Sequence, residues 1–289
     1  MAFFSKPSSW LVILRSHLVR LACFIREQPV RRLLPFLAAA MVVLFLEFLV
    51  TTPTEWQFIL PVVGGIVVIN SIALSKRALL VAGWWHTLFT PLLLTISAGI
   101  LLLFARTSLG RQAVILLAAV AIFIFWEHIW RYYWDRANYH DESLENASLA
   151  LNTLIVWFTS LFLYHLLLDP SILPEQYVTS IIPVSALLVV FIVFYIDYRT
   201  LWVQRYAPSR VWLLLVAQAV VIGELFWVLN FLPNLVEVKA FIVVLAYYLF
   251  TNIGRAHLDG TLRPIVFRRY AYISIISLAV ILITTRWLL

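Results

Sequence analysis

Four polar side chains in three consecutive apolar runs are the first candidates for chemistry: His86, Glu127, His128 and Asn152. An ionisable group inside a membrane span costs about 2.5–3.5 kcal/mol at mid-membrane, so each one is a functional candidate by default. Because the runs are expected to be antiparallel neighbours, these side chains could line one cavity open to the cytoplasm and bind a ligand or substrate. The alternative is that Glu127 only pairs with Arg131, one helical turn later.

Glu224 and Gln218 form a second candidate site, deeper in the membrane. Glu224 lies 13 residues after Val211, the start of its apolar run, so neither end of the expected helix is close to it. A carboxylate at that depth is suited to binding a proton or a cation during transport. Convergence of Glu224, Gln218 and Glu47 on one water-accessible cavity would favour this hypothesis. The alternative is a hydrogen bond between helices.

The chain offers no recognised site for a metal or a covalent cofactor. Its single cysteine, Cys23, excludes an internal disulfide and any zinc or iron–sulfur site built from cysteine pairs. The acidic residues and histidine of residues 135–146 lack a known ligand spacing. We therefore predict no cofactor and no bound metal. The net charge of +7 comes mostly from residues that border apolar runs, which predicts membrane lipids and not nucleic acid as partners.

Transmembrane helices are the elements that must position these residues. Of 289 residues, 63% are hydrophobic and 12% are charged, against about 45–50% and about 25% in soluble domains. A helix needs about 20 apolar residues to cross a bilayer. Nine such runs predict an all-α, polytopic transmembrane helix bundle over residues 33–289. The runs are 33–50, 57–75, 80–104, 113–133, 147–168, 178–196, 211–231, 238–256 and 270–285.

Residues 1–32 are expected to form a cytoplasmic N-terminal segment with its own helix. Trp10, Leu14 and Leu18 recur at a spacing of four, while Arg15 and Arg20 fall on the other side of the same helix. This pattern is typical of an amphipathic helix that lies at the membrane interface, with arginines toward anionic lipid.

The distribution of positive charge predicts the orientation of the bundle. With nine spans and the N-terminus inside, 17 of the 21 Lys and Arg residues fall on the cytoplasmic side, where short loops collect them. The C-terminus is then outside. The loop of residues 106–111 carries two of the four outside charges, and it would lie inside if one of the first three spans were re-entrant. Eight spans are the alternative.

The last quarter of the chain resembles a group of bacterial membrane proteins. The resemblance rests on the stretch of residues 224–233, the pair Tyr247 and Tyr248, and the segments Arg269–Tyr270 and 285–287. These look like uncharacterised multi-pass membrane proteins of small-genome candidate-phyla bacteria. The resemblance implies a bacterial cytoplasmic membrane, and it implies no substrate, cofactor or catalytic residue.

Three functional hypotheses follow from the sequence. The leading one is a non-enzymatic component, either a subunit of a larger membrane complex with protein partners or a lipid-interacting protein. The first alternative is a transporter or channel with Glu224 as its intramembrane carboxylate. The second is a lipid-modifying enzyme that uses His86, Glu127, His128 and Asn152.

Overall fold

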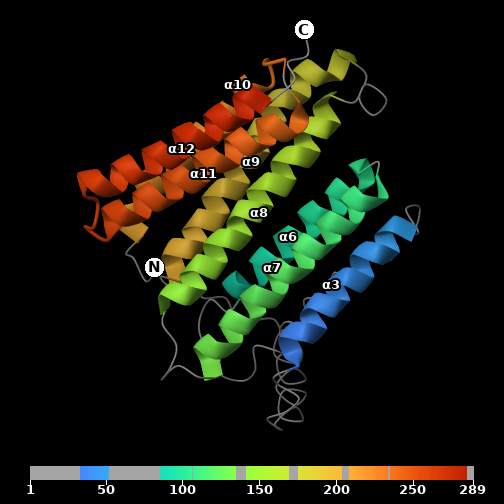
Figure 1. Ribbon diagram of the computed structural model, residues 1–289, viewed down its shortest axis with the longest axis horizontal. Coiled ribbons are helices and arrows are strands. Elements are labelled where there is room, and N and C mark those ends of the chain that lie inside the picture. The colour runs from blue at the N-terminus through green and yellow to red at the C-terminus, as the bar shows by residue number, and fades with distance from the viewer. Residues whose placement is uncertain are drawn as a thin grey trace, which may run out of the picture. The chain divides into compact units, whose positions relative to one another are not determined.

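The computed structural model describes residues 33–51, 85–105, 107–134, 141–168, 175–203, 208–233 and 235–284. Within these ranges the regular elements are eight α-helices, and none is a strand. The predicted interfacial helix of residues 1–32 and the predicted span 57–75 lie outside the described residues. The helices are α3 (Leu34–Thr51), α6 (Trp85–Phe104), α7 (Ser108–Trp134), α8 (Asp141–Leu168), α9 (Glu175–Val203), α10 (Pro208–Leu229), α11 (Val236–Leu258) and α12 (Pro264–Thr284) (Figure 1).

Six of these helices, α3 and α7–α11, are long and apolar enough to cross a membrane. A helix satisfies all its backbone hydrogen bonds internally, which is what hydrocarbon requires of a spanning segment. The chain is therefore a helical, multi-pass integral membrane protein. Each of the six overlaps one predicted span. In α6 only Phe89–Phe104 forms an apolar helix, shorter than a full span, and α12 is not among the six. The count of nine therefore stays a prediction.

The chain divides into two compact units. Unit 1 comprises residues 1–95 and 107–147, and unit 2 comprises residues 96–106 and 148–289. The division falls within α6 and near the start of α8, so both helices contribute residues to each unit.

In unit 1, α3 packs along α7 (Figure 1). The face of α3 that is buried carries Ala38, Val42 and Phe45, which are spaced by four and three residues as one side of a helix requires. Phe36 adds a tilted ring contact to Phe123 of α7, with 4.7 Å between ring centroids. An apolar helix–helix contact with aromatic side chains thus defines this unit.

In unit 2, α10 packs against both α9 and α11, and α12 packs against α11 (Figure 1). Gly223 of α10 makes the contact with α9 close. A Cβ atom at this position would collide with the Val190 side chain and would lie 3.3 Å from the carbonyl oxygen of Ala186. On α11, Gly254 similarly faces Leu214, whose Cδ2 would lie 3.2 Å from an added Cβ. Small residues at these two contacts allow the helix backbones to approach each other.

Candidate functional site

The last turns of α9 carry the residues on which the candidate site is built. The predicted span 178–196 ends just before Asp197, whereas α9 continues to Val203. Because the helix continues, Asp197 and Thr200 stand one turn apart on the same side of it. Both side chains are buried, and Asp197 is only 3% exposed. Arg199 is buried as well, at 1% exposure.

Three hydrogen bonds join side chains of different helices in this region, and two of them involve Asp197 and Thr200. The Tyr247 hydroxyl of α11 donates to Oδ1 of Asp197 at 2.9 Å. The Asn152 amide of α8 donates to Oγ1 of Thr200 at 2.9 Å, and Thr200 in turn donates to the carbonyl oxygen of Ile196. A polar group buried without a partner costs free energy, so these bonds stabilise the buried arrangement.

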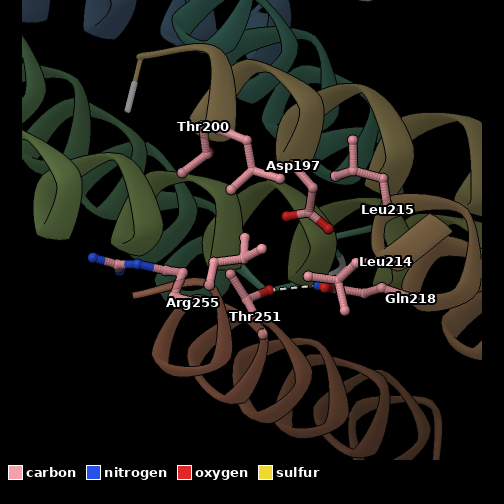
Figure 2. Close-up of a pocket in the computed structure, with 10 residues that line it drawn as sticks. Asp197, Thr200, Leu214, Leu215, Gln218, Thr251 and Arg255 are labelled. Carbon is pink, nitrogen blue, oxygen red and sulfur yellow. Dashed lines mark hydrogen bonds between the residues drawn. The ribbon is translucent and has the colours of Figure 1, made fainter. Parts of the chain in front are cut away.

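The third bond joins α10 to α11. The Gln218 amide of α10 donates to Oγ1 of Thr251 on α11 at 2.6 Å, and both side chains are buried (Figure 2). We call the six side chains joined by these three bonds the polar cluster. Its members are Asn152, Asp197, Thr200, Gln218, Tyr247 and Thr251.

A small cavity of about 20 Å³, the polar cavity, lies beside the polar cluster. Asp197, Thr200, Gln218 and Thr251 contribute its polar wall. Figure 2 shows the Asp197 carboxylate pointing between α10 and α11, toward Gln218 and Thr251. Leucines of α9, α10 and α11 form the apolar wall. A cavity needs about 10–15 Å³ to hold one water molecule, so this one has the volume for a single water.

Positive charge lies close to the polar cavity. Arg255 of α11 is part of the cavity wall. Arg199 is buried two residues after Asp197 on α9, and it interacts electrostatically with the Tyr195 and Tyr247 side chains. One carboxylate, that of Asp197, and one arginine, Arg255, therefore line the polar cavity.

Two residues predicted from the sequence belong to the polar cluster. The sequence places Asn152 in one candidate site with Glu127 and His128, and Gln218 in a second candidate site with Glu224. In the structure Asn152 and Gln218 lie within one polar cluster of unit 2, where Asn152 bonds to Thr200. Glu224 does not share this environment, because its side chain is exposed on α10.

The other predicted residues belong to unit 1. Glu127 pairs with Arg131, with 2.8 Å between Oε1 and Nη2, which is the one-turn ion pair foreseen as the alternative to a ligand site. His128 is half-buried. His86 lies in the first turn of α6, and its side chain is outside the described part of the structure. Glu47 accepts a hydrogen bond from the Gln112 amide at 2.9 Å.

The sequence pattern does not identify Asp197, because the sixth predicted span ends at residue 196, just before this charged residue. The signal that could have found it is the run of aromatic and apolar residues that continues through Tyr195, Tyr198 and Leu201. A carboxylate inside that run is buried if the helix extends. Nothing in the sequence around Tyr247 and Thr251 indicates that their hydroxyl groups bond to another helix.

A second polar contact lies where α10 turns into α11. The Tyr164 hydroxyl donates to the carbonyl oxygen of Phe226 at 3.0 Å, and the two rings stack with centroids 4.4 Å apart. Lys239 is buried in the first turn of α11 at 2% exposure. Its Nζ donates to the carbonyl oxygen of Asn230 at 3.4 Å and lies 5.9 Å from the centre of the Tyr164 ring.

Comparison of the chain with protein-family models, curated proteins and solved structures gave no match. Within the described ranges, no three His, Cys, Asp or Glu side chains gather in a way that could hold a metal ion.

Proposed function

We propose that this chain is a nine-span protein of a bacterial cytoplasmic membrane, with residues 1–32 as an interfacial helix, a cytoplasmic N-terminus and a C-terminus outside. The distribution of positive charge supports the orientation, since 17 of 21 Lys and Arg residues fall on one side. The resemblance of the last quarter to membrane proteins of candidate-phyla bacteria supports the choice of membrane.

We propose further that the protein is a non-enzymatic subunit of a membrane complex, with membrane lipids around it. The observation that carries this proposal is the exposed face of α10. Glu224 stands on this face among apolar residues at helical spacing, which we call the α10 stripe. The stripe comprises Leu213, Ala217, Val220, Val221, Glu224, Trp227 and Val228, and all seven are exposed.

Glu224 is the only ionisable residue of the α10 stripe, and it lies five residues before Leu229, the last residue of the helix. A carboxylate that faces hydrocarbon costs about 2.5–3.5 kcal/mol at mid-span and less toward a helix end, so this range is the upper limit at this position. A neighbouring transmembrane helix with a hydrogen-bond donor or a cation would remove this cost. Such a partner would also bury the valines and Trp227 on either side. The α10 stripe is therefore suited to a partner helix of that chemistry.

A photo-crosslinking residue in place of Val228 tests this proposal in native membranes. We expect a crosslink to one defined membrane protein, which is lost or weakened about three- to twentyfold when Glu224→Leu is added, because one such bond in a membrane is worth about 0.6–1.7 kcal/mol. Glu224→Gln, which keeps hydrogen-bonding atoms, should retain more of the crosslink. The same probe at Ile275 of α12, which is 63% exposed, is the control for unspecific capture.

Two results would contradict the subunit role. The first is a crosslink from residue 228 to another segment of the same chain, which would make the covering helix internal. The second is a crosslink pattern that Glu224→Leu leaves unchanged, together with a gain in thermal stability in detergent. That outcome would mean that Glu224 faces lipid and that no partner depends on it.

Transport is the second candidate, and the polar cavity favours it. From the sequence, the transport hypothesis uses Glu224 as the intramembrane carboxylate. In the structure, Gln218 and Asp197 line a cavity in unit 2. A transport role would therefore use Asp197. Uptake of labelled ions into proteoliposomes, compared between the wild type and Asp197→Asn, would test it. The lipid-modifying hypothesis rests on His86, Glu127, His128 and Asn152. Of these, Glu127 pairs with Arg131, and Asn152 donates to Thr200.

A further inference from the structure

One carboxylate oxygen at the polar cavity has no hydrogen-bond partner. Oδ1 of Asp197 accepts the hydrogen bond from Tyr247. Oδ2 of the same side chain is buried and has no partner in the described part of the chain. Buried polar atoms are almost always paired, so an unpaired carboxylate oxygen beside a cavity of water size calls for a small ligand.

We propose that Oδ2 of Asp197 binds a proton and that, with one water in the polar cavity, it forms a proton-binding site of unit 2. A hydronium ion that enters the polar cavity gives its proton to Oδ2. An O–H bond forms on the carboxyl group, and a neutral water molecule stays behind. The proton-binding site is independent of the proposed subunit role, because the subunit role depends on Glu224 and the proton-binding site depends on Asp197.

The surroundings of Asp197 favour a proton over a metal cation. A metal cation needs several oxygen ligands, and the side chains that line the polar cavity offer, besides Asp197, only the oxygens of Thr200, Gln218 and Thr251. The oxygen of Thr200 accepts from Asn152 while its proton goes to Ile196, which leaves little capacity for a metal. Arg255 of α11 and the neutral Gln218 of α10 line the polar cavity, and Tyr247 of α11 donates to Asp197. Arg199 of α9 interacts with Tyr195 and Tyr247, and the neutral Asn152 of α8 bonds to Thr200.

A protonated Asp197 would also complete the hydrogen bonds of the site. An ionised carboxylate only accepts hydrogen bonds, whereas the protonated acid has one O–H group to donate. From Oδ2 this donor can reach a water in the polar cavity, while Oδ1 continues to accept from Tyr247. A neutral acid also costs much less than a charge on a side chain that is only 3% exposed.

Infrared spectroscopy of the full-length protein in lipid nanodiscs tests the proposal directly. We expect a protonated-carboxyl C=O band that disappears as pH rises, with a carboxylate band growing in its place. The band should be absent in Asp197→Asn and retained in Glu224→Gln, the matched control at an exposed carboxyl group. In Tyr247→Phe the band should move to higher frequency, because the C=O group at Oδ1 then loses its donated hydrogen bond.

Isotope labelling keeps the test independent of whether Asp197→Asn folds. Carbon-13 aspartate in the wild type should shift the band, and the chain has only five aspartates. A band that does not shift, or that persists in folded Asp197→Asn, would overturn the proposal. Loss of the band on adding sodium chloride at constant pH would overturn it too, since a metal cation would then occupy the site.

Discussion

The two units treat their polar side chains in opposite ways. In unit 1, the described pairs lie near the surface: Glu47 with Gln112, and Glu127 with Arg131, whose side chains are 29% and 54% exposed. In unit 2, Asp197 and its partners are enclosed between helices. Carboxylates therefore occur in both units, and the partner and the degree of burial differ between them.

This difference changes which residues deserve mutational study. A surface ion pair contributes about 0–1 kcal/mol, because water and salt screen it. When one partner of a buried hydrogen bond is removed, the other partner is left with neither a protein group nor water to bond to. This lowers the free energy of unfolding by about 1–3 kcal/mol. Glu127 is prominent in the sequence, but Asp197 and Tyr247 carry the larger expected effects.

The largest expected effect comes from the helix contact that encloses the polar cluster. Gly223→Ala should lower the free energy of unfolding by about 1–3 kcal/mol, since the added methyl group collides with Val190, a β-branched side chain that is stiff at χ1. Denaturation by SDS in mixed micelles measures it. Gly254→Ala is the matched control and should cost less, because Leu214 can change rotamer. Equal costs would mean that α9 and α10 are not held as closely as described.

Removal of one hydroxyl group should give the next largest effect. Tyr247→Phe leaves Oδ1 of Asp197 without its donor, so we expect a loss of about 1–3 kcal/mol in the same assay. The counterpart in unit 1 is Gln112→Leu, which removes the donor to Glu47 at an exposed site and should stay within about 0.5 kcal/mol. If both variants cost the same, the contrast between the units would be wrong.

The smallest effects compare one pair from each unit by double-mutant cycles. The coupling between Gln218 and Thr251 should be about 0.6–1.7 kcal/mol and should not change with salt. The coupling between Glu127 and Arg131 should be about 0.3–0.5 kcal/mol and should fall as salt is added. A salt-sensitive coupling in the first pair would mean that water enters the polar cluster.

The sequence predicted the helical membrane architecture because apolar length alone determines it. The six spanning helices overlap the runs expected from hydrophobicity. The ends of the helices are harder to predict from the sequence, because a helix can continue past a charged residue when residues distant in the sequence bury that charge. The end of α9 shows this: Asp197 reads as the start of a loop until Tyr247, 50 residues later, supplies its donor.

The candidate site could be predicted only in part for a related reason. Asn152 and Gln218 stood out because amides are rare in apolar runs. Their partners Thr200 and Thr251 did not, since a threonine in a membrane helix usually bonds to its own backbone. Which amide meets which hydroxyl depends on helix rotation, and periodicity alone does not fix the rotation of helices that are apolar on nearly all sides.

The burial of Lys239 gives the protein a built-in reporter for chemical labelling. Amine-reactive reagents modify lysines that water can reach, and this side chain is 2% exposed beneath the turn between α10 and α11. The sequence has only three lysines, so replacing Lys6 and Lys76 with arginine would leave one modifiable side chain. The rate at which that amine reacts would then measure how often this turn opens, in the intact membrane and without any attached probe.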